Sequence, residues 1–294
     1  MASATNLAKA VQVEWADGAR AEFPYCWLRD ISKTARPSLV HLDVNTRPKA
    51  IECSSNALRV MWPPFLTYNF SSEFLREHAI NHPTTTAESE STTALAAEQT
   101  SNMNFTKSDV HLKEQLWTVT STKTKIDERL IMGSFEWRDT AQEPGTIWAH
   151  LDVVPSLCIV DTLNGPANLT LVDSFRALTL LQQICPKEFK MLEFLSLEYA
   201  EGLFRARHPI CTTKAAENGK VIDSAVFNNM NRSSVITVDA LNKLESLHKF
   251  GRICAELSQS VTLNPGERLI INNKRIFLGK SAQKKSHVIL SLVS

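Results

Sequence analysis

The sequence predicts a mainly β protein of the α+β class, with a small β-rich N-terminal domain, a linker and a larger mixed domain. In the first eighty residues, apolar residues alternate with polar ones in short runs, as in half-buried strands. Residues 82–109 are rich in Thr, Ser, Ala and Glu, and the remainder mixes strand-like runs with apolar residues at helical spacing. We therefore expect domains at 1–81 and 110–294 and a flexible linker at 82–109.

A hairpin is expected near the N-terminus. Val11, Val13 and Trp15 alternate with polar neighbours, Asp17-Gly18 supplies a turn, and residues 20–23 form the returning strand. A later strand ends at Pro63-Pro64, because proline cannot continue a central strand. That strand carries Leu58, Val60 and Trp62, and a short helix is expected at Phe74 and Leu75.

The larger domain mixes strands and helices. Strands are predicted at residues 169–172, 220–227, 261–263, 269–271 and 288–293, with Asn264-Pro265-Gly266 as a turn. Helices are predicted at Ser174–Ile184, with Asp173 or Ser174 as the N-cap, at 186–195, and at 241–257 after an Asp239 cap.

Charge and composition exclude several classes of partner. The 294 residues include 32 Lys and Arg against 31 Asp and Glu, a formal net charge of +1. This balance leaves no basic footprint for nucleic acid, and no run is long and apolar enough to span a bilayer. The N-terminus lacks the pattern of a secretory signal. We expect no nucleic-acid or membrane partner and a cytoplasmic location, with the mitochondrion as the alternative.

The six cysteines are scattered and form no CxxC pair. Without an export signal, they are expected to be reduced and mostly buried thiols.

Two series of motifs follow the order of one enzyme family. The first series is Val13-Glu-Trp-Ala-Asp-Gly, Phe23-Pro-Tyr-Cys-Trp-Leu-Arg-Asp30, His41-Leu-Asp-Val44 and Val60-Met-Trp-Pro63. The second is Leu171-Val-Asp-Ser-Phe175, Cys185-Pro-Lys-Glu-Phe189, Phe227-Asn-Asn229 followed by Arg232, and Asn264-Pro-Gly-Glu267. Together they resemble the gamma-butyrobetaine and trimethyllysine dioxygenases, which depend on iron(II) and 2-oxoglutarate. The gamma-butyrobetaine enzyme is the nearer pattern.

The resemblance implies a double-stranded β-helix of the jelly-roll type as the catalytic domain. We expect it to be incomplete, because the family has several dozen more residues between Asp109 and His150. The family uses iron(II), 2-oxoglutarate and ascorbate, with the iron held by two histidines and a carboxylate. Its substrate is a small trimethylammonium compound held in an aromatic cage, and the resemblance allows a homodimer.

His150-Leu-Asp152 matches the family's His-x-Asp iron-binding motif, which makes His150 and Asp152 the candidate metal ligands. A spacing of two places both side chains on one face of an extended strand. The tripeptide alone is weak, because it also occurs at His41-Leu-Asp43, and a surface or capping role is the alternative.

The family's second histidine lies in an Asn-x-Arg-x-x-His-Gly-Arg run, which here reads Asn273-Lys-Arg-Ile-Phe-Leu278-Gly-Lys280. Leucine has no lone pair to donate to iron, so two protein ligands remain. His287 lies nine residues further on and would need a different strand register.

Two further family sites are altered. The family binds 2-oxoglutarate with an arginine of its last strand, but no arginine follows Arg275 in this sequence. Lys284 or Lys285 could supply a positive charge there, but not the planar, two-pronged guanidinium of arginine. Lys285 is the candidate cosubstrate contact, with a solvated strand edge as the alternative. Zinc is not expected in the N-terminal domain, because residues 31–35 contain no cysteine and Leu66 takes the place of a histidine.

Asn228 and Asn229 fit a family position that contacts the substrate, and a turn role is the alternative. The resemblance implies hydroxylation of gamma-butyrobetaine to L-carnitine in carnitine biosynthesis, impaired here by the altered residues. The alternatives are a trimethyllysine dioxygenase, or a non-catalytic or truncated relative that acts as a binding protein.

Overall fold

The computed structural model describes residues 1–32, 38–41, 43–79, 116–123, 126, 131–137, 141–216, 219–233, 240–282 and 286–293. The predicted linker at 82–109 and the candidate Lys284 and Lys285 lie outside these ranges. The chain forms two compact units. The first comprises Met1–Arg36, Asp43–His111 and Val235–Leu244, and the second Pro37–Leu42, Leu112–Ser234 and Glu245–Ser294. The domain boundaries expected from the sequence stay a prediction.

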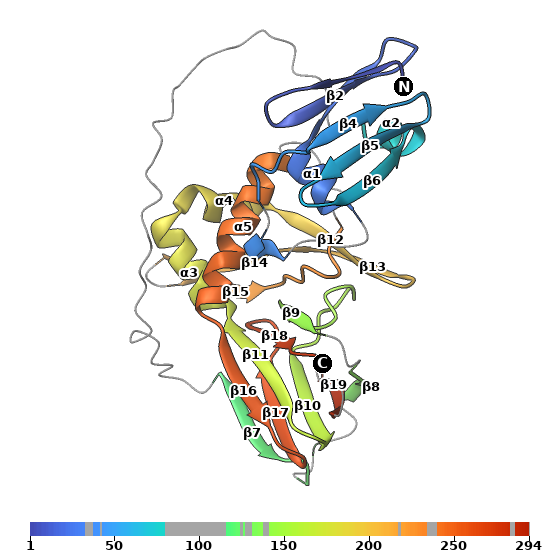
Figure 1. The fold of residues 1–294 in the computed structure, drawn as a ribbon. Coiled ribbons are helices and arrows are strands. Elements are labelled where there is room, and N and C mark those ends of the chain that lie inside the picture. The colour runs from blue at the N-terminus through green and yellow to red at the C-terminus, as the bar shows by residue number, and fades with distance from the viewer. Residues whose placement is uncertain are drawn as a thin grey trace. The chain divides into compact units, whose positions relative to one another are not determined.

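The first unit contains two antiparallel three-stranded sheets, in the orders β1-β2-β3 and β4-β5-β6 (Figure 1). Its strands are β1 (Ser3–Asn6), β2 (Ala10–Glu14), β3 (Arg20–Pro24), β4 (Ala50–Cys53), β5 (Ala57–Trp62) and β6 (Leu66–Ser71). Its short helices are α1 (Tyr25–Asp30) and α2 (Ser72–His78). The predicted hairpin, the strand that ends before Pro63 and the helix at Phe74 are confirmed.

Aromatic packing builds the core of this unit. Trp27 on α1 is buried, with its ring centroid 5.7 Å from that of Phe23 and 6.4 Å from that of Phe74. The Trp-Leu-Arg-Asp motif is therefore helical and contributes to the core. Burial raises the pKa of the neighbouring Cys26 thiol to about 12, so this cysteine stays protonated at neutral pH.

Two antiparallel sheets dominate the second unit, in the orders β7-β17-β10-β19-β8 and β16-β11-β18-β9. Their strands are β7 (Trp117–Ser121), β8 (Ile131–Glu136), β9 (Gln142–Gly145), β10 (Leu157–Asn164), β11 (Ala167–Asp173), β16 (Gln259–Leu263), β17 (Glu267–Asn272), β18 (Ile276–Lys280) and β19 (His287–Val293). The predicted strands at 169–172, 261–263, 269–271 and 288–293 are confirmed. The protein is mainly β with antiparallel sheets, as the sequence predicts.

Apart from β7, the strands of these two sheets form nested antiparallel pairs, in which the first strand along the chain pairs with the last and each following strand with the next one in from the C-terminus. β8 pairs with β19, β9 with β18, β10 with β17, and β11 with β16. This series of pairs has no gap among the described strands, and the expectation of an incomplete β-helix stays a prediction. The segment before His150 supplies both β8 and β9.

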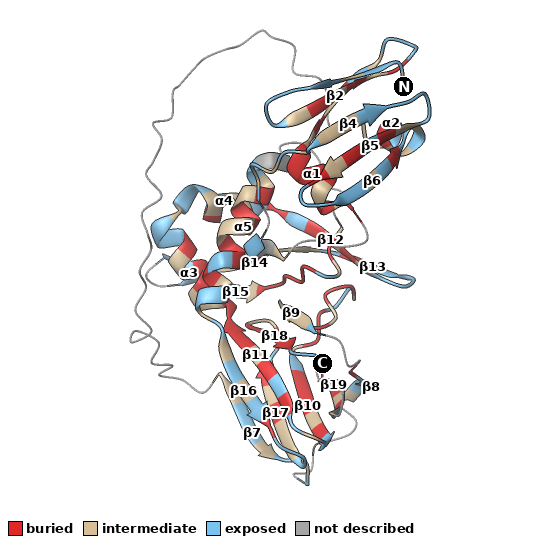
Figure 2. Cartoon of the chain, viewed as in Figure 1, coloured by how far each residue is buried: buried red, intermediate tan, exposed pale blue. Residues whose placement is uncertain are grey.

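Apolar side chains between the two sheets form one core. Leu169 and Leu171 of β11 lie in it with Leu278 of β18 and Val160 of β10. Figure 2 shows buried residues along β10 and β11. Because successive strand residues point to opposite faces, Ile276 and Leu278 face this core while the residue between them faces away.

The segment between β11 and β16 contains helices and two hairpins. Its elements are α3 (Ser174–Ile184), α4 (Pro186–Phe194), β12 (Ser196–Glu201), β13 (Phe204–Pro209), β14 (Cys211–Ala216), β15 (Gly219–Ala225) and α5 (Ala240–Glu256), whose residues from Glu245 onward belong to the second unit. The short helix η1 (Leu39–His41) also belongs to the second unit. Asp173 caps α3 by accepting hydrogen bonds from the backbone N–H groups of Phe175 and Arg176, at 3.1 and 3.4 Å. The predicted helices are confirmed, although Asp239 lies outside the described residues.

The cysteines of this chain are free thiols. Cys26, Cys158 and Cys211 are buried, whereas Cys53 is exposed. None of the helices in the described part of the chain combines the length and apolar character needed to cross a bilayer.

Candidate functional site

His150 ends a turn that follows β9. Residues 147–150 form the turn, the backbone N–H of Leu151 donates to the carbonyl of Trp148 at 3.2 Å, and residues 151–153 bend away. Trp148 has a φ of 61°, in the left-handed region that side-chain-bearing residues seldom adopt. The sequence prediction of an extended strand at His150 and Asp152 is therefore wrong, because the chain reverses direction here.

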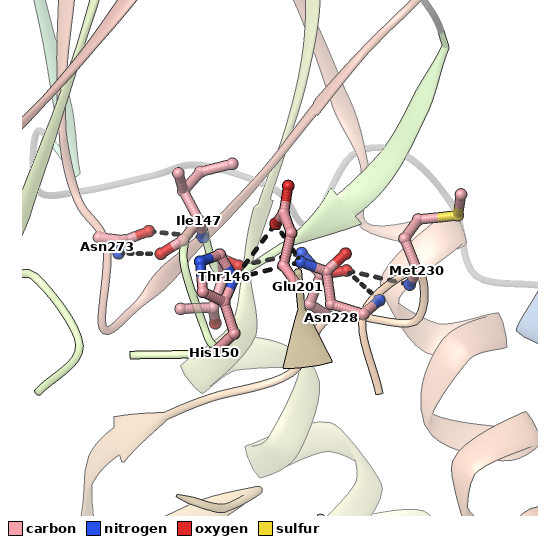
Figure 3. A network of polar contacts seen from close by, with 8 residues as sticks. Thr146, Ile147, His150, Glu201, Asn228, Met230 and Asn273 are labelled. Atoms are coloured by element: carbon pink, nitrogen blue, oxygen red, sulfur yellow. Dashed lines mark hydrogen bonds and ion pairs between the residues drawn. The ribbon is translucent and has the colours of Figure 1, made fainter. Parts of the chain in front are cut away.

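The 226–232 segment holds one side of this turn (Figure 3). The backbone N–H of Thr146 donates to the Phe227 carbonyl at 2.7 Å, and the Phe227 N–H donates to Thr146 Oγ1 at 3.1 Å. Asn228 Nδ2 donates to the Thr146 carbonyl at 3.1 Å. Three hydrogen bonds thus join Thr146 to this segment.

Asn273 holds the other side. Its Oδ1 accepts from the Ile147 N–H at 3.0 Å, and its Nδ2 donates to the carbonyls of Ile147 and Pro155, at 2.9 and 3.1 Å. The side chain is fully buried. Asn273 belongs to the run that resembles the family's second histidine motif, and here it fixes the position of the turn that carries His150.

The His150 ring is buried against a polar cluster (Figure 3). Its Nδ1 lies 3.2 Å from Glu201 Oε2 and 3.4 Å from Asn231 Nδ2, and Asn231 Nδ2 donates to Glu201 Oε2 at 2.8 Å. Burial lowers the pKa of His150, and the Glu201 carboxylate opposes that shift. A neutral ring that donates Nδ1–H to Glu201 presents the Nε2 lone pair, as metal-binding histidines do.

The two other positions that correspond to the family's ligands, Asp152 and Leu278, differ in burial. Asp152 is exposed, two residues beyond His150. Leu278 is fully buried in the core, opposite Leu171 of β11 and Gly145 of β9 in the strand register. Within the described ranges, no three or more His, Cys, Asp or Glu side chains gather in a way that would hold a metal ion.

The two candidate substrate asparagines have different surroundings. Asn228 Oδ1 accepts from the backbone N–H groups of Met230 and Asn231, at 3.0 and 3.3 Å, while its Nδ2 bonds Thr146. These contacts favour the turn role for Asn228. Asn229 Nδ2 donates to Glu143 Oε2 at 3.0 Å, and its Oδ1 accepts from Arg232 Nε at 3.0 Å.

The basic groups considered for the cosubstrate lie in different places. Lys285 is outside the described residues, and His287 lies on β19 with its Nε2 3.5 Å from Glu136. Lys280 of β18 is buried, with its Nζ 3.4 Å from the Trp137 carbonyl oxygen and 5.4 Å from the centre of the Trp137 ring. In the register with β11 it pairs with Leu169, a core residue.

Sequence reasoning missed Glu201, Asn231 and Lys280. Glu201 reaches His150 from the β12–β13 hairpin, fifty-one residues along the chain, and no local pattern indicates that contact. Asn231 lies two residues after Asn229, inside a motif that was recognised. The burial of Lys280 could have been suspected from the sequence, because this lysine ends the otherwise apolar run Ile276-Phe-Leu-Gly-Lys280.

Comparison with solved structures finds similarity to oxygenases. One is an asparagine oxygenase in complex with Fe(II), 3-hydroxyasparagine and succinate, with a TM-score of 0.43 and 14% identity over 53% of this chain and 50% of that one. Another is the non-heme iron oxygenase OrfP in complex with Fe, with a TM-score of 0.41 and 12% identity over 55% of each chain. The chain thus spans about half the length of these proteins. No family model and no curated protein matches it.

Proposed function

We propose that the second unit is a double-stranded β-helix of the gamma-butyrobetaine dioxygenase kind, with impaired hydroxylation chemistry. One observation carries the proposal, namely the nested pairing of the eight strands β8 to β11 and β16 to β19. The first, β8, pairs with the last, β19, the second, β9, with the seventh, β18, the third, β10, with the sixth, β17, and the fourth, β11, with the fifth, β16. Such nested antiparallel pairing in two sheets is the arrangement of a jelly roll. In this order, the His150 turn follows the second strand and Leu278 lies on the seventh.

The iron site retains two of its three ligands under this proposal. His150 would bind through Nε2, oriented by Glu201, and Asp152 would bind through its exposed carboxylate. Leu278 offers no donor atom, so the described residues do not fit the family's three-ligand iron set. Bound iron(II) would activate oxygen in the family's reaction, and the loss of one ligand weakens its retention here.

The proposed substrate and cosubstrate follow from the motif resemblance. They are gamma-butyrobetaine, hydroxylated to L-carnitine, and 2-oxoglutarate, with trimethyllysine as the alternative substrate. Without the family's arginine, 2-oxoglutarate loses a charge-assisted contact of about 1.5–3 kcal/mol, or about tenfold or more in affinity. Lys285 remains the proposed, weaker replacement.

The decisive experiment restores the third ligand. Leu278→His should raise iron(II) affinity, measured by anaerobic titration, because it returns an imidazole to the seventh strand. Leu171→His is the matched control, since Leu171 is the register partner of Leu278 and equally buried, but lies on the fourth strand. The unmodified chain should release succinate and form L-carnitine feebly or not at all with iron(II), ascorbate and 2-oxoglutarate under air.

Family-like turnover that His150→Ala abolishes would contradict the impaired site and require a third ligand from elsewhere. Equal iron affinity in the unmodified chain, Leu278→His and Leu171→His would contradict the metal site itself.

A second candidate function is a non-catalytic binding protein. One observation favours it, because Leu278 fills the position between the sheets with core packing rather than leaving it open. Tight binding of gamma-butyrobetaine without iron or turnover would support this candidate over the first.

A further inference from the structure

A cavity of about 90 Å³ lies within the second unit. Its walls come from β9, β18, α5, the 227–229 segment and the segment with Ser38 and Val40, and include Glu143, Phe227, Asn229, Phe250, Ala255 and Phe277. A water-sized group needs about 10–15 Å³ of such volume, so the cavity has room for about six non-hydrogen atoms.

This cavity is separate from the space between the sheets. Phe277 lines the cavity, while the adjacent Leu278 belongs to the core between the sheets. Neighbouring strand residues point to opposite faces, so the cavity lies on the outer face of the four-stranded sheet. It is therefore distinct from the position at which the family holds iron, and the inference does not rest on the proposed function.

Three phenylalanines form the apolar part of the wall. The ring centroid of Phe250 lies 6.0 Å from that of Phe227 and 6.1 Å from that of Phe277, both in edge-to-face packing. All three side chains are buried. Such mutual packing fixes the rings in place and gives a rigid apolar surface.

One carboxylate marks the polar end of the cavity. Glu143 Oε2 accepts from Asn229 Nδ2 at 3.0 Å, and Asn229 is held in turn by Arg232 Nε at 3.0 Å. Asn229 is the only hydrogen-bond partner of this carboxylate in the described part of the chain, so Oε1 keeps its capacity to accept. The Glu143 side chain is only partly exposed, and an apolar ligand would take away its remaining water without replacing the lost hydrogen bonds.

We propose that the cavity binds a small alkylammonium ion. The alkyl chain lies against Phe227, Phe250 and Phe277, and the ammonium group donates a hydrogen bond to Glu143 Oε1. A primary alkylammonium ion matches both parts of the wall. Its charged NH₃⁺ group has three donors for the carboxylate, and its apolar carbon chain suits the phenylalanine rings. A four-carbon chain with its nitrogen matches the size of the cavity.

The test is titration calorimetry of the full chain with butylammonium chloride and with butan-1-ol, its neutral counterpart of the same length. Butylammonium should bind at least about tenfold more tightly than butanol, since a hydrogen bond between charged groups has that effect. Glu143→Gln should lower butylammonium affinity by about tenfold or more while its side-chain carbonyl still accepts from Asn229. Ala255→Leu should abolish binding by filling the cavity, and the exposed position of Ala255 tolerates the larger side chain.

Glu256→Gln is the matched control for Glu143→Gln, because it removes one negative charge from α5, a helix that lines the cavity, at a residue that does not line it. It should bind butylammonium as the unmodified chain does. Equal binding of butanol and butylammonium, an equal loss in Glu256→Gln, or no binding by the unmodified chain would each overturn the proposal. Thermal melting of every variant shows whether a lost affinity reflects a lost fold.

Discussion

At the residue scale, two asparagine side chains fix the turn that carries His150. Asn228 bonds the Thr146 carbonyl, and Asn273 bonds both polar backbone groups of Ile147. Both residues lie in runs that resemble family motifs, yet their contacts in this protein are to the backbone. A side chain that satisfies several buried backbone groups is costly to remove, because each group left unpaired keeps its desolvation penalty.

Asn273→Ala should therefore destabilise the protein by about 2–4 kcal/mol, because it leaves the Ile147 N–H and the Ile147 and Pro155 carbonyls without this partner. Urea unfolding followed by circular dichroism measures the change. Asn272→Ala is the control, since the Asn272 side chain is exposed and, in the described structure, accepts a hydrogen bond only from the Lys274 N–H. Similar losses in both variants would show that Asn273 does not hold the turn.

At the element scale, local patterns predicted several strands and helices that have one buried face, but missed β12, which also alternates. β2 alternates buried and partly exposed residues, and α3 begins at a clear aspartate cap. β18 escaped prediction because all five of its residues are buried and give no alternation. The turn at His150 was missed because it depends on the backbone of Trp148 and on hydrogen bonds to Asn228 and Asn273, which are distant in the sequence.

Gly279 permits the close approach of β18 to β9. A Cβ at this position would lie 2.8 Å from both the Gln142 carbonyl oxygen and the Pro144 nitrogen. Gly279→Ala should therefore force the strands apart and lower the free energy of unfolding by about 1–3 kcal/mol. The control is Thr170→Ala on the paired strand β11, expected to cost less than about 1 kcal/mol. Denaturant midpoints compare the two, and an unchanged midpoint in Gly279→Ala would mean that β9 does not pack as described.

At the scale of the whole molecule, the second unit depends on pairs that are remote in sequence. Ile131 of β8 pairs with Val293 of β19, and Trp117 of β7 with Ile271 of β17. Alternation predicts a strand but carries no information on which distant strand it joins, so the sequence predicts no strand order and the motif resemblance implied only the type of fold. The same resemblance predicts His150 and Asp152 as candidate ligands, but it could not reveal Glu201, because that contact depends on the fold of the β12–β13 hairpin.

The division of the chain into domains makes a prediction at this scale. Residues 82–109 carry too few apolar side chains to offset the entropy of ordering, so a protease should reach this segment first. Brief digestion with a low concentration of a broad-specificity protease, followed by mass spectrometry, should give two large fragments that end within 82–109. Strand β15, which pairs with β14, strand β16, which pairs with β11, and helix α5 should resist longer, because their cleavage requires local unfolding. First cleavage within residues 220–263, with 82–109 protected, would show that the linker is structured and that the domain boundaries lie elsewhere.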